Sequence, residues 1–131
     1  IFLMVGINDI SHDLTGEQVA ELCLKVIEKI RRDAPTTKLY VQSILPINEG
    51  FERWKTLENK TDVVPAVNRR VKAYCEKQGI DYIDLFSKFT RHGSYELRRE
   101  LSVDGLHLSA QGYKQWAFIL KRYFKECGAV K

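Results

Sequence analysis

Three short apolar runs alternate along the chain with three segments in which apolar residues recur at helical spacing. The runs are residues 1–5, 39–45 and 80–86, and a helical pattern follows each of them. Such strand–helix alternation implies right-handed crossovers and a parallel sheet with helices on both faces. With 131 residues the chain has room for one domain and too little for two.

Each helical segment carries its own start or stop signal. A capping-box pattern begins at Thr15, and Pro35 closes the helix behind it. The second helix is expected from about Asp62 to Gly79, a natural helix stop, and Ser109 is expected to cap the third. The apolar stripes predicted to face the core are Val19, Leu22, Cys23, Val26, Ile27 and Ile30; Val64, Val67, Val71, Tyr74 and Cys75; and Tyr113, Trp116, Ala117, Leu120 and Phe124.

The opening of the chain is unusual, because its first five residues are all apolar. This run predicts a strand buried on both faces, and domains seldom begin with such a strand and no lead-in. We therefore expect residues 1–131 to be the C-terminal portion of a single larger domain that lacks its first strands here. An exposed apolar edge at residues 1–5 would pair with that missing segment or associate with another chain.

Composition narrows the class of protein. Apolar residues make up 44% of the chain and charged residues 29%, as in ordinary globular domains. No apolar run reaches the length of a membrane span. The net charge of +4 is spread over helix faces without an aromatic-plus-basic motif, so we expect no nucleic-acid partner. Three cysteines without a pairing or metal pattern favour a cytoplasmic protein; a secreted or periplasmic one stays open, because any signal would precede Ile1.

Two connections join the expected elements. Residues 47–60 form a long polar connection that carries Phe51 and Trp54. Trp54 would wall a substrate site, stacking on a sugar or covering an acyl chain, although a surface loop pinned by one aromatic explains it equally well. Residues 87–103 mix basic and acidic residues, and we expect a short helix near Tyr95–Glu100.

Two polar clusters fall at expected carboxyl ends of strands, where open α/β sheets hold their sites. In the second cluster, Asp104-Gly105-Leu106-His107, the spacing can bring the Asp104 carboxylate to one imidazole nitrogen of His107. That contact would leave the other nitrogen as a general base. A loop hydrogen bond without catalysis explains the pattern as well. Asp104 and one histidine are too few ligands for a metal, and no cofactor motif appears.

The first cluster is Gly6-Ile7-Asn8-Asp9, directly after the opening apolar run. The Asn8 amide there can donate a hydrogen bond to a developing oxyanion. Gly6 would let the backbone turn sharply and approach a substrate. The alternative is that Asn8 and Asp9 are simply Asx-turn and helix-entry residues.

The order of these features is more specific than either cluster alone. A GxND cluster after an apolar strand, two strand–helix units, and DxxH before the last helix resemble the SGNH (GDSL-type) hydrolase family. Ile1 to Asp9 resemble the family's third block and Asp104 to His107 its fifth, with further similarity at residues 41–46 and 106–113. The chain is similar to bacterial acylhydrolases and acetylesterases, and more distantly to platelet-activating-factor acetylhydrolase catalytic subunits.

The resemblance implies a three-layer α/β/α, flavodoxin-like fold and ester hydrolysis through an acyl-enzyme. By position, Asn8 would be a side-chain oxyanion donor, His107 the general base and Asp104 its orienting acid. The family's first block, a Gly-Asp-Ser segment with the nucleophile, is absent, and so is the second, whose glycine supplies a backbone donor. Both would lie upstream of Ile1.

None of the six serines has a Gly-Asp-Ser or nucleophile-elbow context. Ser11 would line the site or mark the entry to a helix. We therefore expect the chain alone to be inactive and the intact protein to be a carboxylic ester hydrolase acting on a small acyl ester, such as an acetylated sugar. The alternatives are a noncatalytic binding domain on the same fold, and an acyltransferase that differs only in its acceptor.

Overall fold

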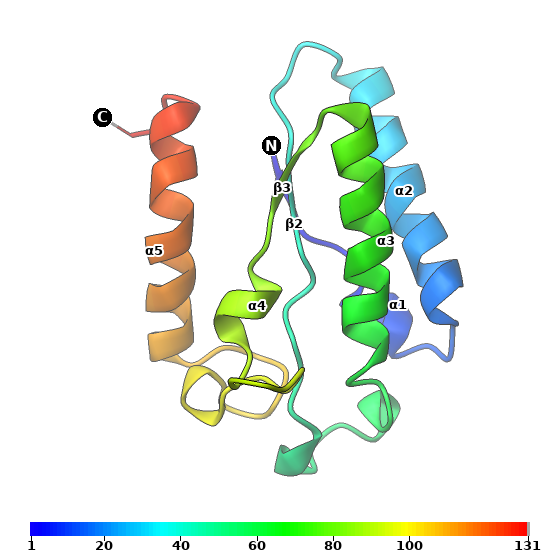
Figure 1. The fold of residues 1–131 in the computed structure, drawn as a ribbon, viewed down its shortest axis with the longest axis vertical. Helices are drawn as coiled ribbons and strands as arrows, with labels where there is room; N and C mark the ends of the chain where they lie inside the picture. Colours follow the sequence, from blue (N-terminus) through cyan, green and yellow to red (C-terminus); the bar gives the residue numbers. More distant parts are fainter. Residues whose placement is uncertain (131) are drawn as a thin grey trace.

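The structure is a computed structural model that describes residues 1–130, and it follows the predicted alternation of strands and helices (Figure 1). The strands form one parallel sheet in the order β1-β2-β3. The strands are β1 (Phe2–Leu3), β2 (Tyr40–Gln42) and β3 (Asp81–Ile83), and the α-helices are α1 (Ile7–Ile10), α2 (Gly16–Asp33), α3 (Val63–Gln78), α4 (Phe86–Phe89) and α5 (Ala110–Glu126).

Helices cover both faces of the sheet, so the predicted three-layer α/β/α class is confirmed. Figure 1 shows α2 and α3 on one side of the strands and α5 on the other. A buried cluster under α2 and α3 is built around residues such as Ile27 and Val67, while the cluster under α5 includes Ile83 and Leu120. Within residues 1–130, no helix is both long and apolar enough to cross a membrane.

The predicted helix signals are confirmed in detail. The Thr15 hydroxyl accepts the Gln18 amide at 3.1 Å, and the Gln18 side chain accepts the Thr15 amide at 2.9 Å, which completes the capping box. Gly79 ends α3 with a φ of +69°. The Ser109 hydroxyl accepts the Gly112 amide at 3.1 Å at the start of α5.

The second and third strands are shorter than the apolar runs that predict them. After β2, the Asn68 side chain accepts the Ile44 amide at 2.8 Å and donates to the Ile44 carbonyl at 2.9 Å. The Asn68 side chain thereby bonds to the backbone groups of Ile44 that a neighbouring strand would otherwise pair with. The Ser43 hydroxyl accepts the amides of Leu85 and Phe86, at 2.9 and 2.8 Å, and the chain turns there into α4. Side chains therefore end both strands early.

The prediction of a first strand buried on both faces is wrong for this structure. Phe2 and Leu3 are half-buried, while Ile1 and Val5 are 46% and 36% exposed. The reason is that β1 pairs with β2 alone and forms an edge of the sheet. The predicted stripes are also wider than the buried helix faces, since Leu22, Val26 and Tyr113 are exposed.

The loops at the carboxyl ends of the strands gather at one end of the molecule (Figure 1). The GxND segment, expected as a loop, forms α1, and the connection at residues 47–60 contains the 3₁₀ turns η1 (Glu49–Phe51) and η2 (Lys55–Leu57). The short helix expected near Tyr95–Glu100 forms only at the end of that range, as the 3₁₀ helix η3 (Arg99–Leu101), while Leu97 bridges Thr90 in an antiparallel pair.

The cysteines Cys23 and Cys75 are buried on α2 and α3, as their spacing predicts. Burial raises the pKa of each thiol to about 11. Both thiols therefore stay protonated at neutral pH and behave as small apolar side chains.

Candidate active site

The Asp104 carboxylate and the His107 imidazole are in direct contact. Asp104 Oδ2 lies 2.7 Å from His107 Nδ1. The other carboxylate oxygen, Oδ1, accepts the backbone amides of Leu106 at 2.9 Å and His107 at 2.7 Å. The His107 side chain is 61% exposed, whereas that of Asp104 is only 13% exposed. The loop thus presents the ring to solvent and keeps its partner inside.

The environment of Asp104 determines which way this hydrogen bond runs. Burial raises the pKa of the carboxyl, but the bonds from the His107 ring and the two amides outweigh it and lower the pKa to about 2. An ionised carboxylate can only accept, so Nδ1 of His107 carries the proton. In the neutral ring the lone pair then lies on Nε2, which has no hydrogen-bond partner among residues 1–130. This is the protonation state that a general base requires.

The Asp104–His107 loop is anchored from outside by Asn48. The backbone amide of Asn48 donates to the Gly105 carbonyl at 2.8 Å, and Gly105 has a φ of +90°. A Cβ at Gly105 would lie 2.3 Å from the Asn48 carbonyl oxygen, so no other residue fits there. The buried Asn48 side chain donates to the Leu97 carbonyl at 2.8 Å and to Glu96 at 3.0 Å. Asn48 therefore joins three loops.

Sequence reasoning missed Asn48 and Ser102, whose hydroxyl bonds to the His107 carbonyl. Both lie in irregular segments, where no helical or strand period marks a residue as buried. The only available signal was their polar character beside the apolar residues Ile47 and Leu101. Such a signal cannot reveal distant partners, as in the bond from Asn48 to Leu97, which lies 49 positions away.

Trp54, expected as a weak candidate for the substrate wall, lies against the histidine. Its ring centroid is 5.5 Å from that of His107, with the planes at 61°. The side chain is 39% exposed. Trp54 also lines, with Gly105, a cavity of about 390 Å³ under the 47–60 connection. The residue therefore borders the imidazole on one side and an open cavity on the other.

Gly6 and Asn8 lie at the start of α1. Gly6 is buried with a φ of +125°, and a Cβ there would lie 2.7 Å from Ile44 Cδ1 and 3.2 Å from Cys23 Sγ. The close packing against Ile44 explains the glycine without a ligand. Asn8 is exposed, and no hydrogen bond within residues 1–130 involves its side-chain amide. Its amide is free to donate to another molecule.

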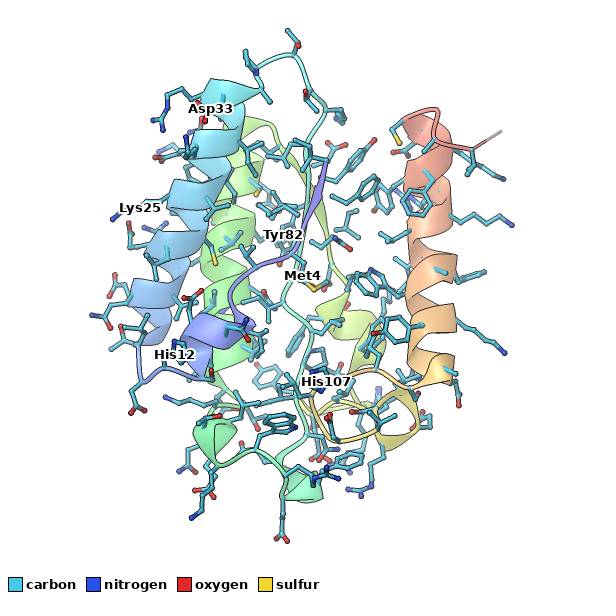
Figure 2. The ribbon with its side chains drawn as sticks, turned by 180° about the vertical axis from the view of Figure 1, so that it is seen from behind. Met4, His12, Lys25, Asp33, Tyr82 and His107 are labelled. Carbon is cyan, nitrogen blue, oxygen red and sulfur yellow. The ribbon has the colours of Figure 1, made fainter. Side chains whose placement is uncertain are left out.

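The two polar clusters border the same cavity. Ile7, which precedes Asn8, and Leu106, which precedes His107, both line an apolar cavity of about 130 Å³. The other lining residues are Met4, Val5, Ile44, Leu45 and Pro46. Figure 2 shows Met4 and His107 in line along the strands, with His107 nearer the end where the loops gather. The fold therefore brings the neighbours of Asn8 and of His107 together.

The serine hydroxyls have other partners than the His107 ring. Ser11 donates to the Asn8 carbonyl at the end of α1, so it is not a helix-entry residue. Ser43 and Ser109 make the bonds described above, Ser87 donates to Asp84, and Ser94 accepts the Glu96 amide. No serine among residues 1–130 hydrogen-bonds to the imidazole. In the same residues, no group of three or more His, Cys, Asp or Glu side chains could hold a metal ion.

Comparison with known proteins agrees with this architecture. The chain matches the family model of the GDSL-like lipase/acylhydrolase family over residues 1–115. It shares 29% identity and a TM-score of 0.75 with a structure from Streptococcus pneumoniae described as a platelet activating factor, covering 94% of this chain and 58% of that one. No curated protein sequence matches the chain.

Two further structures have the same fold. A GDSL-like lipase from Bacteroides thetaiotaomicron has 18% identity and a TM-score of 0.79, over 96% of this chain and 62% of its own. The esterase domain of the zebrafish ZfL2-1 retrotransposon ORF1 protein has 25% identity and a TM-score of 0.66, over 95% and 67%. The chain thus spans about three fifths of the length of the first two relatives. From the match over residues 1–115, the chain belongs to the GDSL-like lipase/acylhydrolase family.

Proposed function

We propose that this chain supplies the general base and an oxyanion donor of a serine ester hydrolase. The observation that carries the proposal is the 2.7 Å contact between Asp104 and His107, which leaves Nε2 of an exposed ring without a partner. His107 is the base, Asp104 orients it, and Asn8 is the side-chain donor to the oxyanion. Membership of the GDSL-like lipase/acylhydrolase family supports this chemistry.

In the proposed reaction, His107 Nε2 takes the proton of a serine hydroxyl as the serine oxygen attacks the ester carbonyl. The carbonyl oxygen becomes negatively charged and accepts a hydrogen bond from the Asn8 amide. The protonated ring then gives its proton to the leaving alcohol, and an acyl-serine remains. Water repeats the sequence with the same base, releasing the carboxylic acid and restoring the serine.

The nucleophile in this proposal lies outside residues 1–131, because no serine among the described residues hydrogen-bonds to the His107 ring and none stands in a Gly-Asp-Ser segment. The serine would come from a segment that pairs with the free edge of β1, where Ile1 and Val5 are exposed. Residues 1–131 are then the C-terminal portion of one SGNH-like domain. An isolated chain would hydrolyse no ester.

The proposed substrate is an ester with a short acyl group, such as an acetylated sugar. The apolar cavity beside Ile7 and Leu106, at about 130 Å³, is close to the roughly 150 Å³ cavity known to hold benzene. A long acyl chain would not fit there. Trp54 offers a stacking surface for the alcohol part of the ester, and the cavity of about 390 Å³ beside it is lined by both apolar and hydrogen-bonding side chains.

The test is hydrolysis of p-nitrophenyl acetate by two proteins. One is this chain alone; the other is a chimera that joins it to the part of the Streptococcus pneumoniae relative that it does not cover. We expect turnover from the chimera and none from the chain. His107→Ala should abolish the chimera's activity, while His92→Ala, at an exposed histidine, should not.

Two results would overturn the proposal. If the folded chimera with an intact serine shows no turnover, the chain is better described as a binding domain. If the chain alone is fully active, its nucleophile lies among its own residues and the assignment of an external serine is wrong.

A further inference from the structure

We infer that Ser102 is a positioning residue that holds the His107 imidazole on the Asp104 carboxylate. The inference deepens the proposed function and rests on it for its catalytic meaning. Ser102 follows η3 and is 8% exposed. Its own geometry can be tested without any substrate.

The Ser102 hydroxyl bonds to the backbone of both Asp104 and His107. Its Oγ donates to the His107 carbonyl at 2.7 Å and accepts the amides of Gly105 at 2.8 Å and Asp104 at 3.3 Å. A hydroxyl has one donor and two acceptor sites, so Ser102 uses its full capacity on this loop. One side chain therefore fixes the backbone of both Asp104 and His107.

Backbone bonds close the same loop at its base. Ser102 and Leu108 form an antiparallel bridge, and the Val103 amide donates to the His107 carbonyl at 3.1 Å. These bonds keep the two ends of the loop together but do not reach the amides of residues 104 and 105. The hydroxyl alone bonds to those amides from inside the loop. Without it, the backbone at Asp104 can move, and the contact with the ring lengthens and weakens.

The chain contains a matched control at Ser43. This serine is 1% exposed, and its hydroxyl also accepts two backbone amides, those of Leu85 and Phe86. Ser43→Ala and Ser102→Ala therefore remove the same group and leave the same number of amides unpaired. Any general loss of stability appears in both variants, whereas a change at His107 is expected only in Ser102→Ala.

The experiment is NMR of the full 131-residue chain with labelled histidine and aspartate. In the wild type and in Ser43→Ala, we expect the His107 proton on Nδ1, and in Ser102→Ala a mixture of tautomers like that of the exposed His12 and His92. We also expect the Asp104 titration midpoint to rise from about 2 toward 3.8 in Ser102→Ala only. Ser102→Thr should restore both signals, because residue 102 has the extended backbone that threonine favours.

The outcomes separate this inference from the proposed function. Unchanged His107 and Asp104 signals in Ser102→Ala overturn the inference, as do equal changes in Ser43→Ala. In an active chimera, Ser102→Ala should lower kcat about 10- to 100-fold with little change in KM, and Ser43→Ala should not. An inactive chimera would defeat the proposed function, while the NMR signals would still decide the role of Ser102.

Discussion

The indole of Trp54 lies edge-on to the imidazole of His107, with the ring centroids 5.5 Å apart. Through this contact, the segment of residues 47–60 packs against the loop that carries His107, the proposed base. It gives Trp54 a role beside the histidine in addition to the proposed contact with substrate.

Removing the indole should weaken catalysis without abolishing it. Aromatic contacts of this kind contribute about 0.5–1.5 kcal/mol, so we expect Trp54→Ala to lower kcat/KM of the chimera about 2- to 10-fold. Trp54→Phe should keep most of the activity. Steady-state hydrolysis of p-nitrophenyl acetate measures both, with Phe118→Ala, on the exposed side of α5, as the control. Loss of all activity in Trp54→Phe would contradict this prediction.

Substitution of the proposed catalytic residues should act on kcat. In the chimera, His107→Ala should lower kcat by several orders of magnitude, because proton transfer from serine loses its base. Asn8→Ala should lower kcat about 10²–10³-fold with little change in KM, because the amide acts mainly on the transition state. Thermal unfolding should change little in Asn8→Ala, since that side chain is exposed and makes no hydrogen bond within residues 1–130. Unchanged kinetics would mean that the residue has been misassigned.

The low pKa of Asp104 predicts how stability depends on pH. Its folded pKa of about 2 lies below the ordinary value of 3.8. The ionised form therefore stabilises the fold, fully above about pH 4, and this contribution is lost as the pH falls toward 2. We expect the difference in unfolding free energy between wild type and Asp104→Asn to shrink as the pH falls from 4 to 2. Urea unfolding at a series of pH values measures it; a constant difference down to pH 2 would refute it.

Gly6 should tolerate no side chain. At a φ of +125°, Gly6→Ala adds backbone strain of about 1–3 kcal/mol, and the contact with Ile44 Cδ1 adds an overpacking cost of similar size. Gly93→Ala is the control, because Gly93 also has a positive φ but nothing lies within 4 Å of its Cβ position. Urea unfolding should show a larger loss for Gly6→Ala, partly recovered by adding Ile44→Val, which removes the clashing Cδ1. Equal losses of unfolding free energy at both glycines would exclude a contribution from the clash with Ile44 Cδ1.

The sequence was sufficient for the class of fold and for the elements that carry periodic patterns. Thr15, Gly79 and Ser109 begin or end helices as predicted, because capping depends on residues only a few positions apart. The strand lengths were overestimated, because the side chains of Ser43 and Asn68 bond to the backbone of neighbouring elements. Such long-range contacts leave no local pattern.

The contacts of the candidate site are likewise of two kinds, local and long-range. The contact of Asp104 with His107 follows from a spacing of three residues, and the structure contains it. The contact of Trp54 with His107 joins loops 53 positions apart, and no period in the sequence reports it. The role of Asn48 could not be predicted either, because its partner Leu97 is 49 positions away. The sequence predicts contacts between residues a few positions apart, but it does not predict how one loop packs on another.

The Asp104 carboxylate makes its hydrogen bonds to residues two and three positions away. Bonds that close such small loops cost little chain entropy and lower the contact order of the region. The paired ring and carboxylate can therefore form early in folding, before the sheet is complete.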